Sequence, residues 1–280
     1  MVIALTTASC TNIFLQPDRV LHDRPERVGA VWQEVHFISS DGTELTGLWF
    51  PAKNGASKGV IVHFHGNGEN MTSHFLFVYW LALESYDVFT FDYRGYGASG
   101  GNKSVSGSIE DGVAALRCAR SRAGGARERL IVVGQSMGGA LALAALERDG
   151  GEGVRGLILD STFASYQGVA QDKLRQWWLT WPLQWPLSRL LISDRFAPRR
   201  LIARRKPVPL LMLHARGDPV VPYEQGRKVY ELASGPKEFW KLDSVGHTEA
   251  MFALGPKYRP AILAWLERAL SPARSGSALP

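Results

Sequence analysis

The chain has 280 residues, and 45% of them are hydrophobic, which is enough apolar material for one large core in a single domain. The formal net charge is +6, but no helix-turn-helix, zinc-ligand or RNA-binding pattern accompanies it, so we expect no nucleic-acid partner. Two cysteines, Cys10 and Cys118, exclude a disulfide framework.

Residues 1–29 carry no strand or helix pattern, and we predict an N-terminal arm there. Leu5–Cys10 resembles a bacterial lipobox, in which cleavage before the cysteine leaves that residue to carry lipid. No positively charged region precedes the motif, and the apolar run is too short for an export signal or a membrane span. If the natural start lies upstream of Met1, Cys10 is a lipid anchor in the cell envelope. The alternative is a frayed terminus with an ordinary cysteine in a cytoplasmic protein.

Residues 30–270 alternate strand patterns with helix patterns, and residues 271–280 have the composition of a disordered tail. The predicted strands are Trp32–Ile38, Glu44–Phe50, Gly59–Phe64, Val88–Tyr93, Leu130–Val133, Gly156–Thr162, Pro209–His214 and Glu238–Leu242. The predicted helical runs are Phe75–Leu83, Ile109–Arg120, Ala140–Leu146, Tyr223–Ala233 and Lys257–Leu270. This order predicts an α/β fold with a mostly parallel sheet, helices on both faces, and functional residues on loops at the carboxyl ends of the strands.

A serine stands at the sharpest turn of this pattern. The segment Gly134-Gln135-Ser136-Met137-Gly138 lies between an apolar strand and an alanine- and leucine-rich helix. Glycines permit a turn that is too tight for a Cβ atom. Gly-x-Ser-x-Gly between a strand and a helix is typical of a nucleophile elbow, so we predict that Ser136 is a catalytic nucleophile.

Three segments together resemble the α/β-hydrolase family. They are Gly134–Gly139, His65-Gly66-Asn67 and the stretch from Phe91 to Ser99, which reads Phe-Asp-Tyr-Arg-Gly-Tyr-Gly-x-Ser. Within that family they resemble the Bem46-like and ABHD13/ABHD17-like serine hydrolases. The resemblance covers about residues 32–270 and implies an α/β-hydrolase fold, with an eight-stranded, mostly parallel sheet and a short cap inserted after the sixth strand.

The resemblance also implies a set of site residues. In the family the nucleophile is followed along the chain by an acid and then a histidine, and the matching residues are Asp218 and His247. The backbone N–H groups of Asn67 and Met137 are the implied oxyanion-hole donors. Asp160, at the end of an earlier strand, is the competing acid, because a few hydrolases take their carboxylate from that strand.

Residues 165–207 interrupt the strand-helix alternation where the family carries its cap. Four tryptophans occur in this segment, and we predict that they line a pocket for an acyl chain; they are Trp177, Trp178, Trp181 and Trp185. The alternative is that their rings cover the edge of the sheet. A basic run follows the tryptophans and favours either peripheral binding to a membrane surface or a solvated face; it consists of Arg195, Arg199, Arg200, Arg204, Arg205 and Lys206.

The predicted function is hydrolysis of a small-molecule acyl ester or lipid, through a Ser136-Asp218-His247 triad and an acyl-enzyme. A peptidase of the prolyl-oligopeptidase type and a hydrolase-like binding protein are the alternatives. The predicted chemistry needs no cofactor. His63 and His65 share one face of a strand, but no third ligand is evident, so we predict no metal site and assign His65 to bracing its loop.

Overall fold

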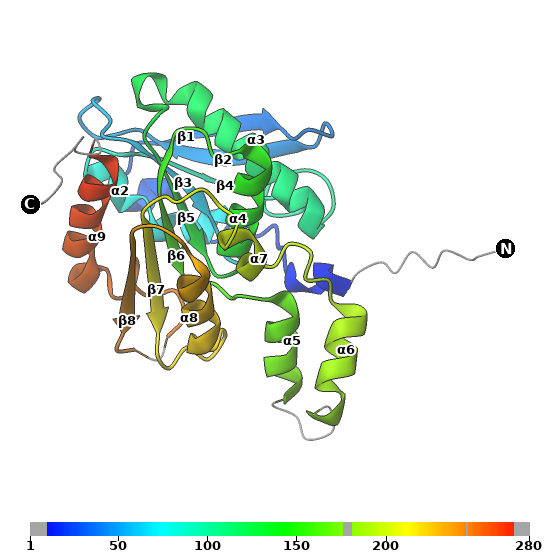
Figure 1. Cartoon of the computed structure of the whole chain (residues 1–280). Helices are drawn as coiled ribbons and strands as arrows, with labels where there is room; N and C mark the ends of the chain where they lie inside the picture. The colour runs from blue at the N-terminus through cyan, green and yellow to red at the C-terminus, as the bar shows by residue number, and fades with distance from the viewer. Residues whose placement is uncertain (1–9, 176–180, 245, 272–280) are drawn as a thin grey trace, which may run out of the picture.

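Eight strands form one sheet in the computed structural model, which describes residues 10–175, 181–244 and 246–271 (Figure 1). The strand order is β1-β2-β4-β3-β5-β6-β7-β8; β2 pairs antiparallel with β1 and with β4, and every other neighbouring pair is parallel. The strands are β1 (Gln33–Ile38), β2 (Glu44–Phe50), β3 (Val60–Phe64), β4 (Asp87–Phe91), β5 (Leu130–Gln135), β6 (Val154–Asp160), β7 (Leu210–Ala215) and β8 (Lys237–Leu242). The predicted mostly parallel, eight-stranded sheet is confirmed.

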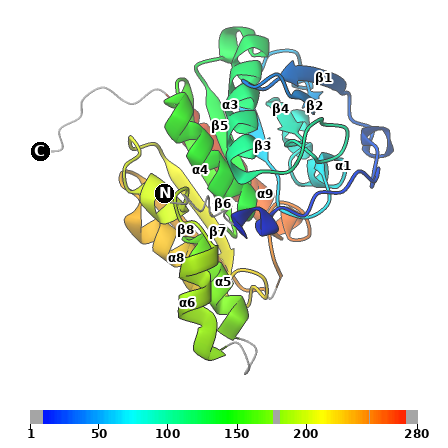
Figure 2. The ribbon, with the colours of Figure 1, turned by 90° about the vertical axis from the view of Figure 1, so that its right-hand side faces the viewer.

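Helices cover both faces of the sheet (Figures 1 and 2). The α-helices are α1 (Met71–His74), α2 (Trp80–Leu83), α3 (Val105–Arg122), α4 (Met137–Asp149), α5 (Tyr166–Arg175), α6 (Gln184–Leu191), α7 (Pro198–Ile202), α8 (Tyr223–Leu232) and α9 (Gly255–Leu270). The 3-10 helices are η1 (Cys10–Phe14), η2 (Pro25–Val28), η3 (Phe75–Phe77), η4 (Gly124–Ala126) and η5 (Trp181–Leu183).

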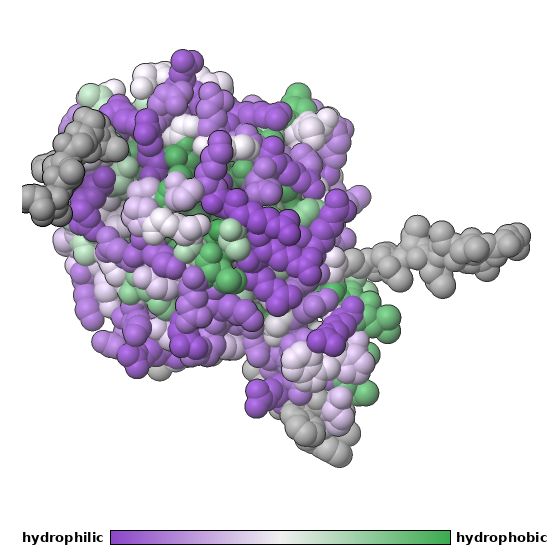
Figure 3. All heavy atoms as spheres, in the orientation of Figure 1, coloured by the Kyte–Doolittle hydropathy of each residue, from purple (hydrophilic) through white to green (hydrophobic). Residues whose placement is uncertain are grey.

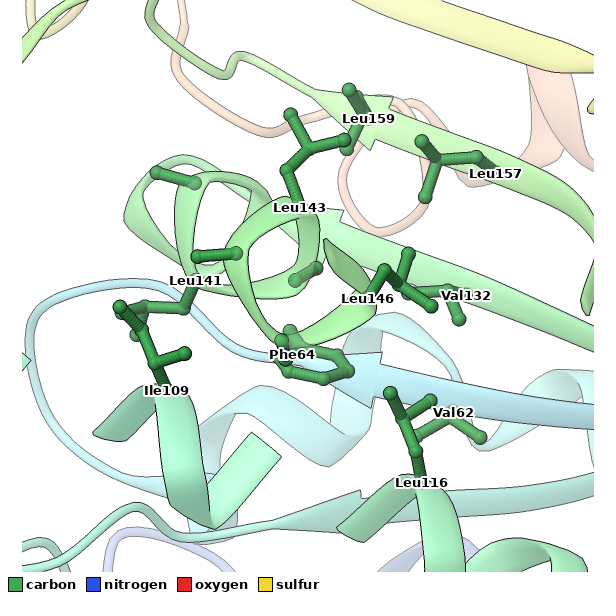
Figure 4. Packing of buried hydrophobic residues seen from close by; sticks show 14 of the residues in the cluster. Val62, Phe64, Ile109, Leu116, Val132, Leu141, Leu143, Leu146, Leu157 and Leu159 are labelled. Carbon is green, nitrogen blue, oxygen red and sulfur yellow. The ribbon is translucent and has the colours of Figure 1, made fainter. Parts of the chain in front are cut away.

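Two hydrophobic clusters, one on each face, account for this layered arrangement. Successive side chains of a strand point to opposite faces, so Val62 and Phe64 of β3 join the cluster under α3 and α4, whereas Ile61 joins the cluster under α2 and α9. Figure 4 shows the first cluster, in which Leu146 of α4 lies beside Val132 of β5 and Leu141 of α4 points toward Ile109 of α3. Both faces of the central strands are therefore buried, which explains their continuous apolar sequences.

The predicted helical run Phe75–Leu83 is broken into η3 and α2. The backbone N–H of Val78 bonds the carbonyl of Phe75 at 3.0 Å, and the backbone N–H of Leu81 bonds the carbonyl of Val78 at 3.0 Å. Backbone bonds to the third preceding residue are those of 3-10 turns, so the run is not one continuous α-helix.

The loop after β4 is held by a buried ion pair. The Arg94 guanidinium donates to Asp111 on α3 at 2.8 Å and to Asp41 in the β1–β2 hairpin at 2.6 Å. Asp111 is fully buried, so Arg94 supplies the opposite charge that its carboxylate requires. Asp92 accepts a hydrogen bond from the N–H of Met71 at 2.7 Å. Asp92 and Arg94 thus brace the loops around the end of β4.

The cap follows β6 and projects from the carboxyl end of the sheet. It contains α5 and α6, which lie side by side (Figures 1 and 2). The N-terminal element η1 lies next to α6, and its Thr11 hydroxyl accepts a hydrogen bond from the N–H of Ser193 at 2.9 Å. Residues 1–9 of the predicted arm and 272–280 of the predicted tail lie outside the described residues. Among the described helices, none is long and apolar enough to cross a membrane.

Candidate active site

Ser136 occupies the turn between β5 and α4 in a rare backbone conformation, with φ of 52° and ψ of −118°. The two glycines that follow the turn allow close contact with neighbouring segments, because they have no side chain. A Cβ atom on Gly138 would lie 2.1 Å from the carbonyl oxygen of Phe64, and one on Gly139 would lie 1.9 Å from the hydroxyl of Thr162. The Gly-x-Ser-x-Gly-Gly sequence therefore lets the start of α4 approach the ends of β3 and β6, and it leaves Ser136 at the apex of the turn.

Asp218 and His247 meet beyond the ends of β7 and β8. The Nδ1 atom of His247 bonds the Oδ2 atom of Asp218 at 2.7 Å, and the N–H groups of Val220 and Val221 donate to Oδ1 at 2.8 and 2.9 Å. Burial raises the pKa of the Asp218 carboxyl, but the hydrogen bond and charge of His247 and the two N–H groups together bring that pKa below its ordinary value. Asp218 is thus held as a carboxylate that orients the imidazole.

Asn67 and Met137 both border the space in front of Ser136. Met137 begins α4, and the first N–H groups of a helix have no partner within it, so they can face an anion. The side-chain oxygen of Asn67 accepts a hydrogen bond from the N–H of Gln16 at 2.9 Å, and its carbonyl accepts one from the Tyr96 hydroxyl at 2.9 Å. These bonds hold the Asn67 loop in place.

A cavity of about 890 Å³ lies in front of Ser136 and His247. Its walls come from the cap, from the N-terminal arm and from the loops at the carboxyl end of the sheet. Most of the described lining side chains are apolar, among them Ile13, Phe14, Phe163, Val169, Ala170, Leu187, Leu191, Ile192, Val220 and Val221. The cavity therefore offers an apolar volume directly beside the serine.

A family model described as serine aminopeptidase, S33 matches residues 55–205. The chain is 35% identical over 265 residues to an uncharacterized protein, YfhR, of Escherichia coli strain K12, covering 93% of this chain and 88% of that protein. It is 26% identical to protein bem46 of Schizosaccharomyces pombe, covering 91% of this chain and 83% of that protein. A lysophosphatidylserine lipase of Danio rerio, ABHD12, is 30% identical, covering 81% of this chain and 59% of the lipase.

Solved structures agree on the fold. An esterase of Pyrococcus furiosus superposes with a TM-score of 0.75 at 22% identity, covering 92% of this chain and 98% of the esterase. The chain belongs to the α/β-hydrolase family. Its relatives place it in the Bem46-like group of that family.

In this α/β hydrolase Trp185 does not belong to the pocket wall that the sequence predicted. Trp185 is 55% exposed, lies outside the cavity lining, and has its ring beneath the guanidinium of Arg189 at 5.2 Å. Trp177 and Trp178 lie outside the described residues, and the Trp181 side chain is likewise not described. Aliphatic residues of α6, Leu187 and Leu191, line the cavity instead, because the turns of α6 direct Trp185 to the outer side of the helix.

The basic run after the tryptophans is dispersed over α7 and the loops on either side of it. Arg199 donates to the buried carboxylate of Asp194, and Arg205 is largely buried, so burial lowers the pKa of its guanidinium. Arg195 lies over the ring of Phe196 at 5.2 Å. These cations therefore do not form one continuous basic patch.

The N-terminal arm supplies cavity residues that the sequence analysis missed. Ile13, Phe14 and Gln16 line the cavity of the hydrolase, and Leu15 between them is fully buried. The Phe14 ring packs edge-on against Tyr166 of α5, with ring centroids 5.3 Å apart. The run Ile13-Phe14-Leu15 was the available signal, because three consecutive large apolar residues in an otherwise irregular arm indicate burial. Cys10 is exposed at the edge of the same cavity, and its lipid modification stays a prediction.

The histidines near the site have structural partners. His63 is fully buried between the hydroxyl of Thr90 at 3.1 Å and the side-chain oxygen of Gln135 at 2.8 Å, and burial holds its pKa well below the usual range. The Nδ1 atom of His65 bonds the carbonyl of Gly66 at 2.8 Å, which braces the loop as predicted. Within residues 10–175, 181–244 and 246–271, no group of three or more His, Cys, Asp or Glu residues is arranged to hold a metal ion.

Asp160, the competing acid, lies at the end of β6 and is fully buried. Its Oδ1 atom accepts a hydrogen bond from the Ser161 hydroxyl at 3.3 Å, and the same hydroxyl accepts one from the N–H of Thr248 at 3.2 Å. Ser161 and Thr248 both have positive φ, 54° and 57°. Asp160 therefore supports the loop that carries His247, whereas Asp218 contacts the imidazole directly.

Asp160 gives a pH-dependent prediction. Burial raises its pKa to about 7, against the opposing charge of His247 and the Ser161 hydrogen bond. Between about pH 4 and pH 7 the unfolded chain releases this proton and the folded chain keeps it, so the wild-type protein loses stability as pH rises through that window. Asp160→Asn cannot ionise. We expect its melting temperature, relative to the wild type, to rise steadily between pH 4.5 and pH 7.5 in thermal unfolding followed by circular dichroism. A difference that is the same at every pH would contradict this assignment.

Proposed function

We propose that this α/β hydrolase cleaves carboxylic ester or thioester bonds of acyl substrates through a Ser136-Asp218-His247 triad. The observation that carries the proposal is the 2.7 Å bond between Asp218 and His247 beside an apolar cavity that both His247 and Ser136 line. An imidazole oriented by a buried carboxylate is the group that activates a serine hydroxyl.

In the proposed reaction His247 takes the proton of the Ser136 hydroxyl as the serine oxygen adds to the substrate carbonyl carbon. The bond to Asp218 keeps the Nδ1 proton on the side away from the serine, so the other ring nitrogen is free to accept. His247 then returns the proton to the leaving alcohol or thiol as the carbonyl re-forms. Water repeats the two steps on the acyl-enzyme and releases the acid. This chemistry needs no metal or organic cofactor.

The tetrahedral intermediate carries negative charge on the former carbonyl oxygen. The N–H groups of Asn67 and Met137 are proposed to hold that charge; the first is supported by the bonds that fix its loop, and the second by its place at the start of α4. Preorganised donors need no reorganisation as charge develops, and losing one side-chain donor in such a hole costs about 10²–10³ in rate.

The cavity favours an acyl chain over a peptide. Apolar side chains make up most of its described lining, and Glu69 is the only carboxylate among the described lining residues. Each methylene that is buried against the apolar walls stabilises the bound substrate by about 0.8 kcal/mol. The names of two similar proteins, an esterase and a lysophosphatidylserine lipase, point to the same substrate class. Peptide hydrolysis and a purely binding role remain the alternatives that the experiments below separate.

Labelling by a fluorophosphonate probe tests the nucleophile. We expect the wild-type chain to be labelled and Ser136→Ala to be unlabelled, because the probe phosphorylates only an activated hydroxyl. Hydrolysis of p-nitrophenyl butyrate should fall by at least about 10⁴-fold in the same variant. Ser108→Ala is the matched control, since Ser108 is a fully buried serine of α3 outside the cavity lining, and this variant should keep its label. An unlabelled wild-type protein with a normal melting curve would favour the binding role.

Substitution of the two carboxylates tests the assignment of the acid. Asp218→Asn should lower kcat by about 10⁴-fold, because the amide no longer stabilises the imidazolium and favours the wrong tautomer of His247. Asp160→Asn should retain most of the activity, since its carboxyl bonds Ser161 and not the imidazole. Steady-state kinetics on one soluble ester measures both variants. A larger loss in Asp160→Asn would assign the acid to Asp160.

The acyl-length preference tests the substrate pocket. Val169 of α5 lines the cavity and is 8% exposed, so Val169→Phe should shorten the space available to the chain. In a p-nitrophenyl ester series, kcat/KM of the variant should stop rising at a shorter acyl length than kcat/KM of the wild type. Each methylene that no longer fits in the cavity should lower kcat/KM roughly fourfold relative to the wild type. Val31→Phe, on a residue that is 73% exposed and outside the cavity, is the control. An unchanged chain-length profile would place the acyl group elsewhere.

A further inference from the structure

Large apolar side chains are exposed where the arm and the cap meet. Ile13 of η1 is 68% exposed, and four residues of η5 and α6 are also exposed: Leu183 at 48%, Trp185 at 55%, Leu190 at 73% and Leu191 at 44%. Figure 3 shows hydrophobic side chains gathered at the side of the molecule where Figure 1 places η1 and α6. We call these five residues the mouth surface.

The mouth surface is held as one unit. The Thr11 hydroxyl joins η1 to the N–H of Ser193 just after α6, and the Ser188 hydroxyl accepts a hydrogen bond from Gln171 of α5 at 2.9 Å. These bonds hold α6 against its neighbours on its inner side. The exposed apolar side chains of α6 are therefore held in a fixed position relative to η1 and α5.

The mouth surface is continuous with the interior of the cavity. Ile13 and Leu191 are both exposed to solvent and part of the cavity lining. At about 100° per residue, Leu190 and Leu191 of α6 lie within one arc with Leu187, which also lines the cavity. An acyl chain could therefore pass from a partner on this surface to Ser136 along apolar side chains, without crossing water.

Cations accompany these apolar residues. Arg189 lies over the exposed Trp185 ring, and Lys173 and Arg175 are exposed on α5. Among the described residues, no carboxylate forms an ion pair with any of these three cations. The acidic groups of the cap are engaged elsewhere: Asp172 accepts a hydrogen bond from Gln225, and Asp194 bonds Ser165 and Arg199. The cap and arm thus present the exposed apolar groups of the mouth surface together with cations that pair with no carboxylate among the described residues.

From this combination we infer that the mouth surface docks on an anionic lipid bilayer, with the cavity opening toward the acyl chains. Apolar side chains enter the interface while neighbouring cations meet anionic headgroups. A second copy of the chain fits less well, because it would bring Arg189, Lys173 and Arg175 against their own counterparts. The inference deepens the proposed function, on which it rests, by naming a membrane lipid as the source of the acyl substrate.

Vesicle sedimentation tests the inference without turnover. The chain carrying Ser136→Ala is mixed with vesicles of phosphatidylcholine alone or with phosphatidylglycerol, at low and high salt. We expect binding to the phosphatidylglycerol vesicles that weakens with salt. Arg189→Gln should weaken this binding about fivefold, and Leu190→Glu at least about tenfold. Ile38→Glu changes a residue of β1 with a similar exposure of 66%, and it should bind within twofold of the parent.

Three results would overturn the inference. The first is the absence of binding to phosphatidylglycerol vesicles. The second is an equal loss of vesicle binding in Leu190→Glu and Ile38→Glu. The third is a protein that fails to bind vesicles and forms a dimer in light scattering, which Leu190→Glu dissociates. Melting curves confirm that each variant is folded, which is expected for substitutions at exposed positions. Fluorophosphonate labelling reports separately on Ser136. Failure of the proposed chemistry therefore appears in the labelling, and failure of docking appears in the sedimentation.

Discussion

The first turn of α4 lies in backbone contact with the end of β3, and the conformation of Ser136 depends on that contact. With glycine at position 138, the helix can approach the carbonyl of Phe64 more closely than any side chain would allow. The N–H of Ser136 donates to the carbonyl of Asp160 at 2.8 Å, which ties the turn to β6 as well. A non-glycine residue with positive φ costs about 1–3 kcal/mol, and the buried packing of α4 offsets that cost.

The parallel sheet brings the other site residues to this turn. The carboxyl ends of β5, β6, β7 and β8 lie along one edge, so the loops that follow them are neighbours although they are distant in the chain. The hydroxyl of Ser161 connects two of these loops, since it bonds both Asp160 and the N–H of Thr248. Strained backbone at Ser136, Ser161 and Thr248 therefore occurs where the loops converge on the proposed site.

The cap and the arm turn this open edge into a cavity. The arm contributes Ile13 and Phe14 to the wall, and the N–H of Gln16 bonds the Asn67 side chain that stands beside Ser136. One segment thus shapes the proposed acyl site, holds the proposed oxyanion loop and exposes an apolar residue beside α6. This arrangement links the substrate pocket to the surface by which we infer that the enzyme meets lipid.

Sequence alone determined the order of strands and helices and the elbow at Ser136, and the family resemblance singled out Asp218 and His247 as the residues to examine. The elements and the elbow are local features, because hydrophobic periodicity sets the elements, and glycine and proline set the turns between them. The broken run from Phe75 to Leu83 was missed, because its apolar pattern does not distinguish backbone bonds to the third preceding residue from bonds to the fourth.

Tertiary structure alone shows which of two carboxylates near the ends of buried strands, Asp218 or Asp160, contacts His247. Only in the folded chain does the imidazole of His247 meet one carboxylate, while the other bonds Ser161. It likewise decided that the arm lines the cavity and that Trp185 faces outward. Such contacts join residues far apart in the chain, as Gln16 and Asn67 are, and their partners are set by packing of the whole domain and not by neighbours in sequence.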